Sequence, residues 1–233
     1  MGNPLLSLGW KITDWNGRGK GIHHLGINNK NYIYINIPKN ASTWMKDKFN
    51  GNNINYIKDP IDDATYVVVL KDPIDRWISG AAQAFVGCSP ENPHFFLNIG
   101  FNDIFDHIVF DEHTAPQTMF LDNIDHARTV WFNCDNFLSE TWNHWAVDKI
   151  VPRKQSKWHT DIHNPYNISA LGKANQFPGW YDKSKTVVGW TQQQIKDMLT
   201  EHLNICPAHM THLKEYYKID YDLIESVKFY DAR

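Results

Sequence analysis

The sequence has little cysteine, and its cysteines form no metal or disulfide pattern. Cys88, Cys134 and Cys206 are odd in number and widely spaced, and no two of them make a C-x-x-C pair. This spacing excludes a disulfide framework and a zinc ribbon, and it indicates reduced thiols. We therefore predict a cytoplasmic protein.

Long apolar runs and a large excess of one charge are also lacking. No apolar run approaches the roughly 20 residues that span a membrane, and the first ten residues lack the basic stretch and long apolar core expected of a secretory signal. The net charge of −3 disfavours a general electrostatic grip on nucleic acid or on an anionic membrane. We predict neither as a partner, so an anionic ligand must be held by a local basic pocket. The sequence does not indicate the oligomeric state.

The length of 233 residues predicts a single domain over 1–233. Residues 11–31 are polar and rich in glycine, asparagine and lysine, which predicts an irregular lead-in over 1–31. Much of the proline, glycine and lysine falls within 152–190, and we predict a lid or long loop there.

Two strand–loop–helix units succeed one another. A β-rich run over 32–37 precedes a helix over 43–49, and the apolar run over 66–70 precedes a helix over 76–85. This order predicts parallel strands joined by helical crossovers, and hence an α/β fold. Further helices are predicted through most of 95–145, over 191–204 and between 213 and 229.

The loop after the first strand has the composition of an anion site. Lys39 supplies a positive charge, and Ser42 and Thr43 supply hydroxyl donors where the helix begins. The purely structural alternative is that the two hydroxyls cap the helix and the lysine is solvated. A magnesium-dependent ATP hydrolase is disfavoured, because the pattern G-x-x-x-x-G-K-[ST] is absent.

Two segments together resemble the sulfotransferases that use 3′-phosphoadenosine-5′-phosphosulfate (PAPS). Pro38-Lys39-x-x-Ser42-Thr43-Trp44 resembles their 5′-phosphosulfate loop, and Lys71-Asp72-Pro73-x-x-Arg76-x-x-Ser79 resembles their 3′-phosphate motif, R-D-P-x-x-R-x-x-S. The resemblance implies a three-layer fold like that of P-loop NTPases, with helices flanking a central parallel sheet. It assigns PAPS binding to Lys39, Asn40, Ala41, Ser42, Thr43, Trp44, Lys71, Arg76 and Ser79, with Trp44 stacking on the adenine.

Two residues depart from that pattern. Ala41 stands where many cytosolic members have glycine, although the carbohydrate-directed branch tolerates alanine there. Lys71 replaces the usual arginine, so a guanidinium that can donate two parallel hydrogen bonds to a phosphate is replaced by a single ammonium charge. Arg76 is expected to compensate or, alternatively, to form a structural ion pair with a helix carboxylate.

Two further segments resemble the carbohydrate branch of the family. His113-x-x-Pro116-Gln117 is similar to its H-x-x-P-Q stretch, and the tail from Leu213 to Leu223 is similar to its closing "iY-x-x-D-y-x-L" segment. The resemblance implies transfer of a sulfuryl group from PAPS to a hydroxyl of a carbohydrate or other small acceptor, without an obligatory metal.

Two catalytic residues are predicted. Lys39 would stabilise charge on the bridging oxygen of the leaving phosphate. His113 is the candidate general base, since it lies in the family-like stretch beside acids, and Glu112 is the alternative base. A core or surface histidine with a hydrogen-bond partner is the structural alternative for His113.

No metal site is predicted, because no histidine pair has a third ligand at a convincing spacing. The pairs considered are His23–His24, His159–His163 and His209–His212. Two other functions stay open: a nucleotide-binding or interaction protein on the same fold without transfer activity, and a small kinase with an unusual phosphate loop.

Overall fold

The computed structural model describes residues 21–50, 56–57, 61–87, 105, 108–109, 112–122, 124–151 and 192–232. The chain divides into two compact units, which are described separately. The first unit comprises Met1–Pro73, Pro116–Asp161 and Ile219–Arg233, and the second comprises Ile74–Ala115 and Ile162–Lys218. The lid predicted over 152–190 lies outside the described residues, and the single domain over 1–233 stays a prediction.

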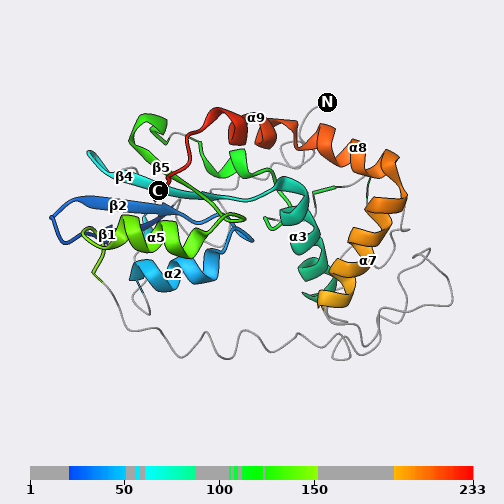
Figure 1. Ribbon diagram of the computed structural model, residues 1–233, viewed down its shortest axis with the longest axis horizontal. Helices are drawn as coiled ribbons and strands as arrows, with labels where there is room; N and C mark the ends of the chain where they lie inside the picture. The colour runs from blue at the N-terminus through cyan, green and yellow to red at the C-terminus, as the bar shows by residue number, and fades with distance from the viewer. Residues whose placement is uncertain are drawn as a thin grey trace. The chain divides into compact units, whose positions relative to one another are not determined.

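The described residues form an α/β structure (Figure 1). Its elements in chain order are β1 (Gly21–Leu25), β2 (Asn31–Ile35), α2 (Ser42–Asn50), β3 (Tyr56–Ile57), β4 (Thr65–Leu70), α3 (Pro73–Gly87), the 3-10 helices η3 (Gln117–Phe120) and η4 (His126–Arg128), β5 (Thr129–Asn133), α5 (Leu138–Ala146), α7 (Gln192–Ile205), α8 (Pro207–Tyr216) and α9 (Lys218–Ser226).

The first unit contains a mixed sheet with the strand order β3-β1-β2-β4-β5. β2 pairs with β4 and β4 with β5 in parallel, whereas β1 is antiparallel to both β2 and β3. The predicted parallel arrangement therefore holds for β2, β4 and β5. β1 and β2 are joined by a short turn, which only antiparallel neighbours permit.

Side chains alternate between the two faces of this sheet, and each face has its own core. Tyr34 and Val67 pack on the face that carries α2 and α5, and Trp142 of α5 joins the same cluster. Ile35 and Val68 pack on the opposite face, where α9 contributes partly buried leucine and isoleucine. Because both faces are covered, β4 is apolar along almost its whole length, as its sequence predicts.

Two segments form strands where the sequence predicted other structure. The predicted irregular lead-in is wrong over Gly21–Leu25, which forms β1 and buries Ile22 in the core. Two adjacent histidines in this segment interrupt the apolar residues by which a strand is recognised in a sequence. The predicted helical region is wrong over Thr129–Asn133, which forms β5. Val130 and Phe132 pack on one face and Trp131 on the other, which is the two-residue period of a strand.

The second unit is described through α3, α7 and α8. On α7 the buried residues Ile195, Met198, Leu199 and Leu203 recur at helical spacing, so one stripe of this helix forms its core face. On α3 a Cβ at Gly80 would overlap the carbonyl oxygen of His113, so glycine permits the close approach of these two segments.

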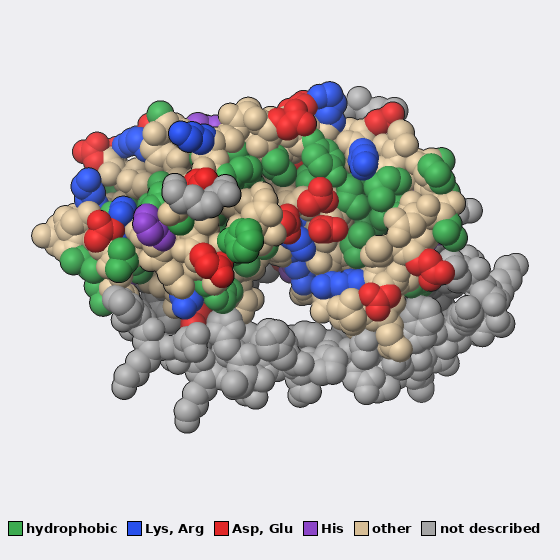
Figure 2. All heavy atoms as spheres, viewed as in Figure 1, with side chains coloured by type: hydrophobic (Ala, Val, Ile, Leu, Met, Phe, Trp, Pro, Cys, Tyr) green, Lys and Arg blue, Asp and Glu red, His purple; other side chains and the backbone are tan. Residues whose placement is uncertain are grey.

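Neither sign of charge dominates the face of the molecule drawn in Figure 2, where lysine and arginine are interspersed with aspartate and glutamate. Within the described residues, no helix has the length and apolarity needed to cross a membrane.

Candidate functional site

The two predicted phosphate loops leave neighbouring parallel strands. β2 runs into the loop that contains Lys39, and β4 runs into Lys71 and Asp72. Since β2 and β4 pair in parallel, their carboxyl ends lie at the same edge of the sheet (Figure 1). This edge is where open α/β sheets generally place their ligands.

The backbone of the first loop has an alternating conformation. Lys39 has φ 71° and Ala41 has φ 53°, both in the left-handed region, whereas Asn40 between them is not. The two left-handed residues bend the loop sharply, and the Asn40 N–H between them donates to the Ile37 carbonyl at 3.3 Å. Ser42 then begins α2, and the first N–H groups of a helix have no carbonyl partner within it.

Replacement of Ala41 by glycine is expected to raise the free energy of unfolding by about 1 kcal/mol. A left-handed φ brings the Cβ of alanine close to the backbone, and glycine removes that strain. Denaturation in urea measures the change. The matched control is Ala208→Gly in α8, where φ is helical and the residue is exposed. That variant should be destabilised. A loss of stability in Ala41→Gly would contradict the left-handed conformation.

A single buried side chain joins the two loops. The Oε1 of Gln117 accepts from Asn40 Nδ2 at 2.5 Å and from the Lys71 N–H at 3.0 Å. Its Nε2 donates to the Lys71 carbonyl at 2.8 Å. Asn40 Nδ2 also donates to the Val69 carbonyl at 2.7 Å. Gln117 and Asn40 are both fully buried, so these hydrogen bonds join the end of β4 to the loop after β2.

Gln117 is itself held by the tail. The buried carboxylate of Asp220 accepts from the N–H of Gln117 at 2.7 Å and from that of Thr118 at 3.0 Å, which caps the start of η3. The hydroxyl of Tyr221 donates to Asp72 at 3.3 Å. All four segments that resemble the sulfotransferases thus contribute a residue to one hydrogen-bonded network.

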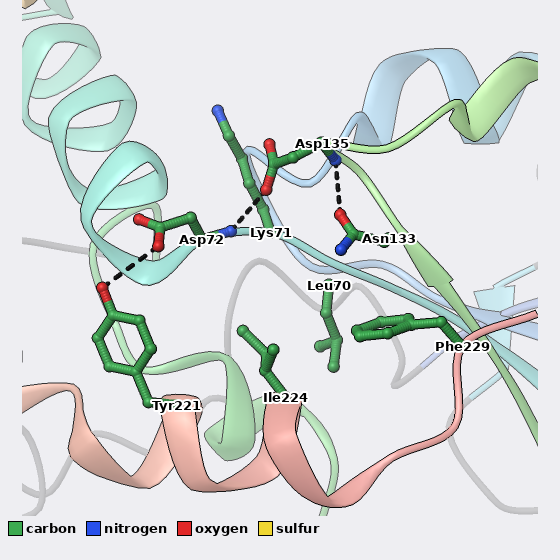
Figure 3. A pocket seen from close by; sticks show the side chains of 8 residues that line it. All are labelled: Leu70, Lys71, Asp72, Asn133, Asp135, Tyr221, Ile224 and Phe229. Carbon is green, nitrogen blue, oxygen red and sulfur yellow. Dashed lines mark hydrogen bonds between the residues drawn. The ribbon is translucent and has the colours of Figure 1, made fainter.

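A small pocket adjoins this network at the ends of β4 and β5 (Figure 3). Its volume is about 160 Å³, well below the roughly 300 Å³ of the smallest usual ligand pockets. The side chains of Lys71 and Asp135 point to the same side, away from the apolar residues. A nucleotide would have to lie across the loops and not within this pocket. The residues that line the pocket are Leu70, Lys71, Asp72, Asn133, Asp135, Tyr221, Ile224 and Phe229.

The thiol next to this pocket is inert. Burial raises the pKa of Cys134 to about 11, Asp135 adds to the shift and Lys71 opposes it. Cys134 is therefore protonated at neutral pH and is no nucleophile. Cys134 and Cys206 are both free thiols.

Trp44, the predicted adenine platform, lies half-buried on α2. Its ring meets that of Trp142 edge-on at 6.2 Å between centroids, and the ammonium of Lys48 lies 5.3 Å from its centroid. These contacts fix the orientation of the indole. Ser42 is half-buried and Thr43 is exposed at the start of the same helix.

Arg76 and Ser79 lie on α3 in the second unit, and both are buried. The guanidinium of Arg76 donates to the carbonyls of Ala115 and, at 2.8 Å, of Glu112. These two carbonyls flank His113. Arg76 thus holds the backbone of the His113 segment, and both roles that the sequence suggested for it stay predictions.

His113 has a carboxylate and an amide as neighbours. Its Nδ1 lies 3.9 Å from Glu112 Oε1, and its Nε2 lies 3.4 Å from Gln83 Nε2. An amide nitrogen only donates, so Nε2 is the acceptor in this contact and Nδ1 carries the proton that faces the carboxylate. In this tautomer the basic lone pair is on Nε2, where it accepts from the Gln83 amide, so an acceptor hydroxyl would have to displace that amide before His113 acted as a general base.

Sequence reasoning missed two groups of residues. Gln117 and Asp220 stood in the quoted segments, but nothing in their local pattern assigned them to each other. In the second unit His202, Cys206 and His209 bring one ligand atom each within 4.8 Å of one another. Burial and His209 together lower the pKa of His202. The separations of four and three residues are visible in the sequence, but the middle ligand is a cysteine, so no histidine pair contains it.

Comparisons of this chain with models of known families, with curated proteins and with solved structures found no match.

Proposed function

We propose that this chain is a PAPS-dependent sulfotransferase with a fold like that of P-loop NTPases. It transfers a sulfuryl group from PAPS to a hydroxyl of a carbohydrate or other small acceptor. We place it in the cytoplasm, in keeping with the free thiols of Cys134 and Cys206.

One observation carries the proposal: Gln117 bonds to both phosphate loops. The loop after β2 and the exit of β4 resemble the two halves of a site for a doubly phosphorylated adenosine. An enzyme that grips both ends of such a molecule needs the two loops held at a fixed separation. The hydrogen bonds from Gln117 to Asn40 and Lys71 supply that restraint.

The charges at the loops suit the ligand. Lys39 and Lys71 are the cations of the two loops, and the first N–H groups of α2 add partial positive charge. Phosphosulfate and 3′-phosphate are both anionic, whereas the chain as a whole carries −3. Binding would therefore depend on these local groups.

In the proposed reaction the bond between sulfur and the bridging oxygen breaks, and a bond forms between sulfur and the acceptor oxygen. The electron pair of the broken bond passes to the leaving phosphate of adenosine 3′,5′-bisphosphate, where Lys39 stabilises the developing charge. The acceptor's hydroxyl proton passes to Nε2 of His113, and Glu112 orients the ring. The transferred group carries less charge than a phosphoryl group, so no metal is required for this step.

The alternative is a nucleotide-binding protein on the same fold without transfer activity. Two features favour it: the left-handed conformation of Ala41, where many cytosolic members of the family have glycine, and a lysine at position 71 in place of arginine. A small kinase is the third candidate, and it would bind ATP together with magnesium.

The test is transfer from PAPS labelled with radioactive sulfur to a broad panel of carbohydrates and small hydroxyl compounds. A labelled product, formed together with an equal amount of adenosine 3′,5′-bisphosphate, is the expected result. Tight binding of the bisphosphate without any labelled product would favour the inactive alternative. Absence of both would overturn the proposal.

A further inference from the structure

The corner between α7 and α8 brings three metal-ligating side chains together. His202 lies in the last turn of α7, Cys206 stands at the start of α8, and His209 lies in the first turn of α8. Their ligand atoms lie within 4.8 Å of one another, and His202 Nε2 is 2.8 Å from His209 Nδ1. All three residues belong to the second unit.

The backbone holds these residues in fixed positions. The N–H of Cys206 donates to the His202 carbonyl at 2.9 Å, and the N–H of His209 donates to the Cys206 carbonyl at 3.1 Å. Cys206 itself is not helical, with φ −122° and ψ 81°, and it forms the corner between the two helices. Phe105 stacks on both imidazoles, with centroid distances of 5.1 Å to His202 and 4.1 Å to His209. The aromatic ring restricts how far the two imidazoles turn.

We propose that His202, Cys206 and His209 form a zinc site in which two imidazole nitrogens and one thiolate bind the ion and water takes the fourth position. Nitrogen and sulfur ligands in tetrahedral geometry are the set that Zn²⁺ prefers. Ligand nitrogens at about 2.05 Å from zinc stand about 3.3 Å apart in a tetrahedron. The present separation of 2.8 Å between the two nitrogens needs to open only slightly.

Binding changes the protons at this corner in a defined way. The thiol of Cys206 loses its proton to solvent, and the imidazole that donates the hydrogen bond between the two histidines moves its proton to its other ring nitrogen. The zinc then replaces that hydrogen bond. The ion would cross-link the end of α7 to the start of α8. This structural role is independent of the proposed sulfuryl transfer.

The competing explanation is a hydrogen bond between two histidines that binds no metal. The two explanations differ in stoichiometry and in the role of Cys206, since a bond between the imidazoles does not need the thiol. His212 offers a matched control: it lies three residues beyond His209 on the same helix, it is exposed, and it stands outside the cluster.

The experiment uses the full chain without an affinity tag, freed of metal with a chelator. Titration with Zn²⁺ against a chromophoric chelator measures affinity, and Co²⁺ substitution reports a thiolate ligand through its charge-transfer absorption. One ion per chain is expected for the unaltered protein and for His212→Ala. Cys206→Ser should bind at least about tenfold more weakly and should lack the charge-transfer band, and His209→Ala should weaken binding similarly.

Three results would overturn the proposal: no stoichiometric binding, equal affinity in Cys206→Ser and the unaltered chain, or a loss in His212→Ala as large as that in His209→Ala. Circular dichroism of the metal-free variants checks that each has folded. Since Cys206→Ser and His209→Ala remove different ligands, a folding failure in one leaves the other to decide.

Discussion

Sulfuryl transfer by the Lys39→Ala variant should fall by about 100- to 1,000-fold, the loss typical of removing one group that stabilises transition-state charge. Lys39 contributes a full positive charge to the proposed phosphosulfate loop, three residues before the start of α2. Charge on the bridging oxygen grows as the bond to sulfur breaks. The loss should therefore appear in kcat more than in nucleotide affinity.

The assay is release of adenosine 3′,5′-bisphosphate in the presence of an active acceptor. Lys30→Ala is the matched control, because Lys30 is an exposed lysine beside the turn between β1 and β2. It should keep its full rate. Near-normal turnover in Lys39→Ala, with a normal unfolding transition, would remove Lys39 from the mechanism.

Gln117→Leu should lower the free energy of unfolding by about 3–5 kcal/mol. Leucine is similar in volume to glutamine but leaves the Lys71 N–H and carbonyl without the partner that each has now. Asn40 Nδ2 loses one of its two acceptors. Each buried polar group left unpaired costs about 1–3 kcal/mol.

Unfolding in urea measures this loss. Gln193→Leu on α7 is the matched control, because Gln193 is exposed. Its stability should change by less than about 0.5 kcal/mol. The Gln117 variant should also bind adenosine 3′,5′-bisphosphate more weakly, since the two loops are no longer joined. A stability loss below about 1 kcal/mol would mean that the three hydrogen bonds contribute little net energy in this setting.

Much of the first unit follows from local sequence patterns. The run Thr65–Leu70 is continuously apolar because both faces of the sheet are covered, and this pattern predicted β4 directly. Pro73 fits the first position of α3, where its missing N–H costs no hydrogen bond. The helices α2 and α7 lie where their spacing predicted them.

Other features could not be predicted from local sequence patterns, because tertiary contacts produce them. β1 forms because its residues pair with β2 and bury Ile22, although its histidines are typical of a loop. The hydrogen bond between Asn40 and Gln117 joins residues 77 positions apart, and the carboxylate of Asp220 binds the N–H of Gln117 across 103 positions. The periodicity of apolar residues along the chain does not predict hydrogen bonds between residues so far apart. The network around Gln117 therefore emerged only from the fold.

The central claim is that the loop after β2 and the exit of β4 together bind a nucleotide phosphorylated at both the 3′ and 5′ positions. Calorimetric titration of the full chain with adenosine 3′,5′-bisphosphate, and separately with ATP and magnesium, tests it most directly. We predict that the bisphosphate binds at one site per chain, without magnesium, and at least about tenfold more tightly than ATP, as expected for a loss of about 1.4 kcal/mol. Equal or tighter binding of ATP with magnesium, or no heat of binding from the bisphosphate, would contradict it.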